Sequence, residues 1–123
     1  MRGKPEFKLI VAGGRDFADR DVCWREILAM QERLAGYQLS IVSGMARGAD
    51  RLGFEVAKKE GIPVHMFPAD WDRYGKSAGY RRNEEMARFA DGLLAFWNKS
   101  SRGTAHMIET MNRAGKPVHI VYY

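Results

Sequence analysis

Residues 41–50 read IVSGMARGAD and join an apolar run to an amphipathic segment through a turn rich in glycine. After the turn, apolar residues recur at the spacing of one helix face, at Ala49, Leu52, Gly53, Val56 and Ala57. A strand that leads through glycines into a helix leaves free backbone N–H groups at the positive end of the helix dipole, which suits a phosphate or another anion. An ordinary strand-to-helix connection would have the same pattern, so both interpretations stay open.

The glycines and polar residues of this turn are candidate ligand contacts. Gly44 and Gly48 would let the backbone turn sharply and approach a ligand closely. Arg47 adds a fixed positive charge, and Ser43 precedes the turn. Asp50 could accept a hydrogen bond from a ribose hydroxyl, or it could only favour the first helical turn.

Repeated alternation of strand and helix patterns predicts an α/β fold. Apolar runs cover residues 8–12, 39–43, 64–67, 92–97 and 118–122, and helix patterns cover residues 20–35, 49–60, 78–90 and 104–114. Strands that alternate with helices pair in parallel through right-handed crossovers. We therefore expect residues 1–123 to form one domain with a Rossmann-like, doubly wound, five-stranded parallel sheet in the order 3-2-1-4-5.

The composition is typical of a soluble globular protein, with 46% hydrophobic residues, 28% charged residues and a net charge of +5. No apolar run approaches the ~20 residues that span a bilayer. The single cysteine, Cys23, fits a reducing compartment, so we expect a cytoplasmic protein. The histidines lack the spacing of metal ligands, and we expect neither a metal nor a cofactor. Exposed methionines could serve a dimer interface, and we expect a homo-oligomer.

Ligands of doubly wound sheets bind beyond the carboxyl ends of the strands, near the point where the strand order reverses. The first strand is followed there by Gly13, Gly14, Arg15 and Asp16, which suit close approach to a phosphate or a ribose. Neither G-x-G-x-x-G nor G-x-x-x-x-G-K-[ST] occurs, so the dinucleotide fingerprint and the P-loop are both missing. A tight turn with Asp16 as a helix cap is the alternative interpretation.

Two further connections reach the same edge of the sheet. Ser101, Gly103 and Thr104 lie where a helix begins, so their hydroxyl and backbone N–H groups could bind a phosphate, or could serve only as a helix cap. Residues 70–76 form a long loop. Its Trp71 or Tyr74 could stack on a base, or could simply cover the edge of the sheet.

Helical periodicity orients the side chains of the third helix. Arg82 and Asn83 flank its buried stripe in the first turn and therefore point toward the ligand edge, whereas Arg81 faces solvent. An inward arginine needs an anionic partner to offset the cost of desolvation. That partner could be a ligand, or it could be Asp50 or Asp16.

Nearly the whole chain, from VAGGRDF at residues 11–17 to GKPV at residues 115–118, resembles the SLOG superfamily of Rossmann-like nucleotide-binding domains, in particular its small YspA-like branch. Residues 43–50 are similar to the S-G-x-A-R-G-x-D segment of the DNA-processing protein A family, whose domain binds single-stranded DNA. The Arg82-Asn83 pair resembles the R-N pair of that family. Residues 82–86 (RNEEM) also resemble the R-K-x-x-M segment of the Lonely Guy phosphoribohydrolases, and this resemblance implies that their catalytic arginine corresponds to Arg82.

The last loop departs from the P-G-G-x-G-T-x-x-E segment of the Lonely Guy enzymes. Met107 stands where those enzymes carry a catalytic glutamate, and Glu109 lies about 200° further around the helix. Whether the chain cleaves N-glycosidic bonds therefore stays open.

Acidic and basic residues both occur at the expected ligand edge, which favours a compact polar ligand over a long nucleic-acid track. We expect the chain to bind a nucleotide or a nucleotide-derived molecule, such as an ADP-ribose-like ligand or a nucleoside phosphate. The alternatives are a single-stranded nucleic-acid binder that stacks bases on aromatic side chains, and an interaction module without a ligand.

Overall fold

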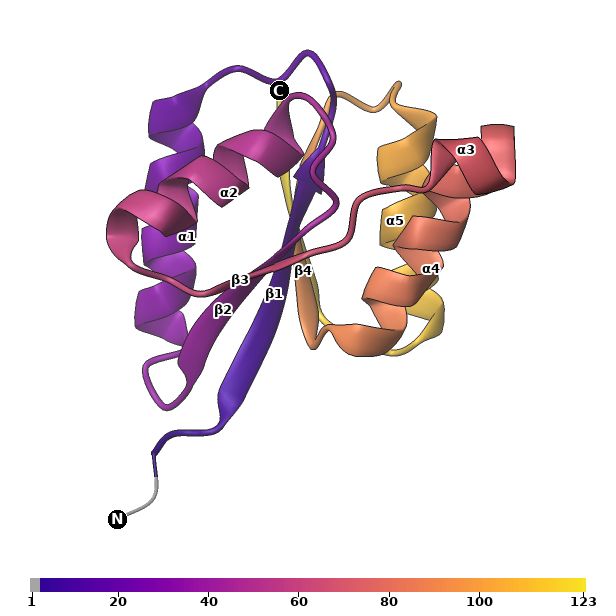
Figure 1. The fold of residues 1–123 in the computed structure, drawn as a ribbon. Coiled ribbons are helices and arrows are strands. Elements are labelled where there is room, and N and C mark those ends of the chain that lie inside the picture. Colours follow the sequence, from indigo (N-terminus) through magenta and orange to yellow (C-terminus); the bar gives the residue numbers. More distant parts are fainter. Residues whose placement is uncertain (1–2) are drawn as a thin grey trace.

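The computed structural model describes residues 3–123 and places five parallel strands in one sheet (Figure 1). The strands are β1 (Glu6–Gly13), β2 (Gln38–Ser43), β3 (Val64–Met66), β4 (Gly92–Trp97) and β5 (Val118–Tyr122). Their order is β3-β2-β1-β4-β5, and every neighbouring pair is parallel. The predicted α/β fold and the predicted strand order are confirmed.

Helices cover both faces of this sheet. Figure 1 shows α1 (Arg20–Arg33) and α2 (Ala49–Glu60) on one face, and α4 (Ala78–Phe89) and α5 (Arg102–Arg113) on the other. No helix within residues 3–123 combines the length and the apolar character that crossing a bilayer requires.

Strand β1 contributes side chains to two separate hydrophobic cores, because successive residues of a strand point to opposite faces. Leu9 and Val11 are fully buried in the core beneath α1 and α2. Ile10 and Ala12 belong to the core beneath α4 and α5, which also contains Met107. The central strand is therefore fixed from both sides, and so is the loop that leaves its carboxyl end.

The strand order reverses between β1 and β4. The loops that follow these two strands therefore begin side by side. Gly13 at the end of β1 pairs with Phe96 near the end of β4. A Cβ atom at Gly13 would lie only 2.3 Å from the Phe96 carbonyl oxygen, so only glycine fits this crossing of the two strand ends. The loops after β1, β2 and β4 consequently open at one edge of the sheet.

The segment predicted as a long loop is helical instead, so that prediction is wrong. It contains α3 (Trp71–Tyr74), followed by a 3₁₀ turn, η1 (Gly75–Ser77), that leads into α4. The Asp70 side chain starts α3 by accepting a hydrogen bond from the Arg73 N–H at 3.2 Å. The sequence pattern missed this helix because its four residues are too few to show a helical period.

Candidate functional site

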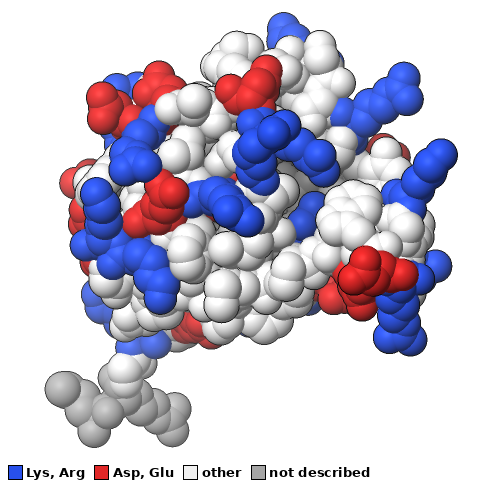
Figure 2. Space-filling view, turned by 45° about the horizontal axis from the view of Figure 1, so that its top comes forward, with Lys and Arg blue, Asp and Glu red and all other residues white. Residues whose placement is uncertain are grey.

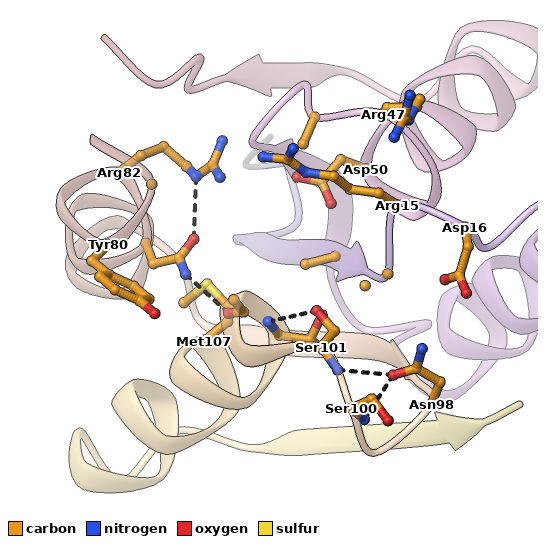
Figure 3. Close-up of a pocket in the computed structure, with 18 of the residues that line it drawn as sticks. Arg15, Asp16, Arg47, Asp50, Tyr80, Arg82, Asn98, Ser100, Ser101 and Met107 are labelled. Atoms are coloured by element: carbon orange, nitrogen blue, oxygen red, sulfur yellow. Dashed lines mark hydrogen bonds between the residues drawn. The ribbon is translucent and has the colours of Figure 1, made fainter. Parts of the chain in front are cut away.

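A pocket of about 750 Å³ opens at the carboxyl ends of the strands. Its walls come from the loops after β1, β2 and β4 together with α3, η1 and the first turns of α4 and α5 (Figure 3). On this face of the molecule, Lys and Arg side chains gather around a hollow, with Asp and Glu side chains close by (Figure 2). This pocket lies at the topological switch point, where the sequence predicts the ligand site.

Most of the contacts predicted from sequence line this pocket, namely Gly13, Gly14, Arg15, Asp16, Arg47, Asp50, Arg82, Asn83, Ser101, Gly103 and Thr104. Ser43, Gly44 and Gly48 do not line it. These three residues shape the turn after β2, and Gly44 lines a smaller neighbouring pocket.

Ser43 and Gly48 hold the turn after β2 in place. The buried Ser43 hydroxyl donates to the Asp50 carbonyl oxygen at 3.0 Å and accepts from the Met45 N–H at 3.1 Å. Gly48 has φ +87°, and a Cβ atom there would lie 2.3 Å from the Gly14 carbonyl oxygen. Gly48, which the sequence suggested as a ligand contact, is therefore required for packing the loops after β2 and β1 against each other.

Arg82 connects α4 to the turn after β2. Its Nη1 donates to the Gly44 carbonyl oxygen at 2.6 Å, and its Nε donates to the Asn83 side-chain oxygen at 3.1 Å. A Cβ atom at Gly44 would lie 2.7 Å from Arg82 Nη1 and 2.7 Å from Asp50 Oδ2, so both side chains would have to shift to admit one. Arg81 lies outside the pocket, where it is exposed and donates to the Ser77 hydroxyl.

Asn83 fixes the orientation of Arg82 from the other side. The buried Asn83 side chain donates from Nδ2 to the Gly103 carbonyl oxygen at 3.2 Å and thereby ties α4 to α5. Because its oxygen accepts from Arg82, the amide bridges Arg82 and the first turn of α5. One rigid network therefore spans the wall from Gly44 to Gly103.

Asp50 is a buried carboxylate in the pocket wall. Burial raises the pKa of Asp50 to about 6, against the opposing influence of the Arg82 charge and of nearby backbone amides. Burial likewise lowers the pKa of Arg82, while the Asp50 charge raises it. Within residues 3–123 no ion pair joins Arg82 to a carboxylate, so the two groups influence each other without direct contact.

Two further arginines at the pocket are free. Arg15 and Arg47 are exposed, and neither side chain has a hydrogen bond or an ion pair within the described residues 3–123. The charge of Arg15 also lowers the pKa of Arg82. The three guanidinium groups therefore create a positive potential that a bound anion would relieve.

Asn98 orders the loop that precedes α5. Its side-chain oxygen accepts from the N–H groups of Ser100 at 2.8 Å and Ser101 at 2.9 Å. The Ser101 hydroxyl in turn caps α5 by accepting from the Thr104 N–H at 3.3 Å. The helix consequently begins at Arg102, two residues earlier than the sequence pattern predicted.

The first turn of α5 has two backbone amides without a partner among the described residues. Within residues 3–123 no acceptor is recorded for the N–H groups of Arg102 and Gly103, and a Cβ atom at Gly103 would meet nothing within 4 Å. A helix N-terminus with free amides favours an anion.

Several pocket residues escaped the sequence analysis. Tyr80 lines the pocket with an exposed ring that lies 4.4 Å from the ring of His106. Tyr123 does not line the pocket itself, but it donates to the carboxylate of the lining residue Asp16 at 2.5 Å and lies over Gly14. No local sequence pattern predicts either contact, because each contact joins residues from different elements. Trp71 lines the pocket as proposed, whereas Tyr74 does not.

Met107 forms part of the pocket floor and is almost fully buried. Glu109 is exposed and lies outside the pocket wall. The residue that the sequence resemblance aligns with the Lonely Guy glutamate is therefore an apolar side chain in the pocket lining. Among the described residues, no group of three His, Cys, Asp or Glu side chains could hold a metal ion.

Residues 7–74 match the YspA, cpYpsA-related SLOG family. The Gene 61 protein of Mycobacterium phage D29 is 38% identical over 117 residues, which cover 90% of this chain and 93% of the phage protein. The chain belongs to the YspA, cpYpsA-related SLOG family. The matched segment carries the loops after β1 and β2, and the phage relative extends the similarity to most of the chain, including the region of Arg82.

A solved structure shares the fold of this SLOG-family chain. DNA processing protein A from Streptococcus pneumoniae superposes with a TM-score of 0.74 at 18% identity. The superposition covers 95% of this chain and 50% of the larger protein. The family and the fold together fit a role connected with nucleotides or nucleic acids.

Proposed function

We propose that the chain binds a nucleotide or a nucleotide-derived small molecule in the 750 Å³ pocket. The observation that carries the proposal is the set of three arginines at the pocket, of which Arg15 and Arg47 have no partner within residues 3–123. Unpaired guanidinium groups beside a concave surface bind phosphate groups well, because each offers several N–H donors in a fixed plane.

The pocket offers a separate partner to each part of a nucleotide. Arg82 and the free amides of Arg102 and Gly103 would bind phosphate oxygens. Asp50 would accept a hydrogen bond from a ribose hydroxyl. The exposed ring of Trp71 would stack on the base.

Single-stranded nucleic acid is the second candidate. The fold similarity to a DNA processing protein and the exposed rings of Trp71 and Tyr80 favour it. The carboxylates of Asp16 and Asp50 in the pocket wall oppose it, because a continuous phosphate backbone would be repelled there. A compact ligand avoids this repulsion by placing hydroxyl groups against the carboxylates.

A protein that binds a nucleotide in this pocket could either sense it or cleave its N-glycosidic bond. We expect no appreciable release of base from nucleoside monophosphates, because Met107 cannot transfer a proton. Turnover that disappears in Arg82→Ala would contradict this expectation. Chromatographic detection of the free base measures it directly.

Isothermal titration calorimetry distinguishes the two ligand classes. We expect adenosine monophosphate or ADP-ribose to bind with one site per chain and to raise the melting temperature by mass action. Oligonucleotide binding should be weak and should disappear with modest salt. Tight oligonucleotide binding that falls steeply with salt concentration would favour the nucleic-acid alternative instead.

A further inference from the structure

A second pocket of about 350 Å³ lies beside the main pocket. Its own residues are Gly44, Met45, Pro68 and Ala69, which come from the turn after β2 and the connection after β3. None of these side chains is charged, and no carboxylate lines the second pocket. Its chemistry therefore differs from that of the hydroxyl-rich and amide-rich wall that α5 contributes to the main pocket.

The two pockets share one wall, which contains Arg15, Arg47 and Arg82. Trp71 and Ala46 complete this shared wall. Every arginine that we assign to phosphate binding thus borders both pockets. A phosphate group held by these arginines would have open space on each side of it.

The turn that encloses the second pocket is held in an unusual conformation. Met45 has φ +60°, which is unfavourable for a residue with a side chain. Hydrogen bonds hold it on both sides, from its own N–H to the Ser43 hydroxyl and from Arg51 Nε to its carbonyl oxygen at 3.2 Å. The wall of the second pocket is therefore formed before any ligand arrives.

The charge at the shared wall exceeds what one phosphodiester requires. Three guanidinium groups lie at this boundary, and the two carboxylates near it, Asp16 and Asp50, line the main pocket and not the second one. A bridging diphosphate carries two negative charges and can accept hydrogen bonds from several arginines at once, whereas a phosphodiester carries one. The charge balance favours a dianionic group over a phosphodiester, and the open space on both sides of the arginines favours a diphosphate centred between the pockets.

From this geometry we propose that the second pocket is a subsite for the far half of a two-ended nucleoside diphosphate. The diphosphate lies against Arg15, Arg47 and Arg82, and the nucleoside occupies the main pocket. The group esterified to the second phosphate, a sugar or a second nucleoside, occupies the space beside Met45 and Ala69. This inference rests on the proposed function and narrows its ligand to one chemical class.

Calorimetric titration of the wild-type protein and Ala69→Trp with two probes tests the subsite. Adenosine monophosphate fills only the main pocket, whereas ADP-ribose extends past the arginines. We expect ADP-ribose to bind the wild-type protein at least about tenfold more tightly than adenosine monophosphate, which corresponds to about 1.4 kcal/mol. In Ala69→Trp the indole fills the second pocket, so this advantage should disappear while the affinity for adenosine monophosphate stays within about threefold, or 0.7 kcal/mol.

Controls separate pocket filling from damage to the fold. Ala35→Trp adds the same indole at an exposed position outside both pockets and should change neither affinity. Pro68→Trp fills the second pocket from a different backbone position and should reproduce the effect of Ala69→Trp. Unchanged far-ultraviolet circular dichroism shows that each variant is folded.

Each contrary outcome has a distinct meaning. Equal affinities of the two probes for the wild-type protein, or an equal loss of both in Ala69→Trp, would overturn the subsite and leave the proposed function standing. No binding of either probe would overturn the proposed function itself. A single-stranded dithymidylate that binds more tightly than ADP-ribose and is displaced by Ala69→Trp would assign the second pocket to nucleic acid and overturn the diphosphate proposal.

Discussion

Arg82 on α4 donates a 2.6 Å hydrogen bond from Nη1 to the carbonyl oxygen of Gly44 in the turn after β2. The same guanidinium lines the main pocket, so it both connects two elements and presents charge to a ligand (Figure 3). Arg81, one residue earlier, is exposed and packs over the ring of Tyr74 at 4.5 Å.

This contrast predicts that substitutions of these two neighbouring residues weaken nucleotide binding by different amounts. Arg82→Ala should weaken nucleotide binding by about 1.5–3 kcal/mol, the scale of a charge-assisted hydrogen bond. Arg81→Ala should change binding by only about 0–1 kcal/mol because its charge is exposed. Titration calorimetry measures both, and urea unfolding corrects for the stability that Arg82 contributes through Gly44. Equal and small effects would show that α4 does not present Arg82 to the ligand.

Gly48 should be the least replaceable glycine of the turn after β2. A methyl group there would push on the Gly14 carbonyl oxygen, which accepts from the N–H groups of Phe17 and Ala49. Gly48→Ala should therefore lower the free energy of unfolding by roughly 3 kcal/mol or more. Gly61→Ala is the matched control, since Gly61 also has a positive φ but open space around it, and it should cost only about 1–2 kcal/mol. Similar losses in both variants would argue against loop-to-loop packing at Gly48.

Asp50 should make stability depend on pH. Its pKa is about 6 in the folded protein against 3.8 for an ordinary aspartate, so the folded state binds more protons than the unfolded state between these values. The free energy of unfolding contributed by Asp50 therefore falls as pH rises from about 4 to about 6, and it stays low at higher pH. Relative to the wild-type protein, Asp50→Asn should gain on the order of 2–3 kcal/mol between pH 4 and pH 7.

Urea unfolding across this pH range measures the effect of Asp50. Asp72→Asn is the control for the substitution itself, because the Asp72 side chain is exposed and has no hydrogen bond or ion pair within residues 3–123. Parallel pH profiles for the wild-type protein and Asp50→Asn would mean that the Asp50 carboxylate is not buried as the structure has it.

Two substitutions of Asn98 distinguish the effect of an ordered loop on ligand binding from the effect of charge at the pocket. Asn98→Ala removes the acceptor for the N–H groups of Ser100 and Ser101, so it should cost about 1–3 kcal/mol of stability and weaken ligand binding. Asn98→Asp keeps the acceptor but adds a negative charge at the pocket. We expect Asn98→Asp to retain stability and still to bind nucleotide at least as poorly as Asn98→Ala. Wild-type affinity in Asn98→Asp would show that the phosphate lies far from this loop.

The sequence predicts this fold well because a doubly wound sheet depends on local periodicity and on a chirality rule that holds for nearly all parallel connections. The same periodicity distinguishes Arg82 from Arg81. Contacts between elements that lie far apart in the sequence produce no such periodic pattern. Tyr123 over Asp16 and Tyr80 against His106 arise only when the loops are brought together.

Glycine shows a second limit of sequence interpretation. The spacing of Gly44 and Gly48 is typical of a loop that approaches a phosphate, but the same residues are needed wherever protein atoms approach closely. Gly48 makes room for the loop after β1, and Gly44 makes room for Arg82. A glycine in the sequence indicates that other atoms approach the backbone closely at that position. It does not indicate whether those atoms belong to a ligand or to the protein.

Nuclear magnetic resonance titration of the ¹⁵N-labelled protein with adenosine monophosphate and ADP-ribose tests nucleotide binding in the main pocket most directly. We predict that the largest shifts occur at the backbone amides of Arg15 and Gly103 and at the Arg82 Nε–H, because these three residues line the pocket. Amides of residues 35–38, at the opposite end of the strands, should not move. If millimolar nucleotide moved no resonance, or moved only resonances away from the pocket, the chain would not bind nucleotides at this site.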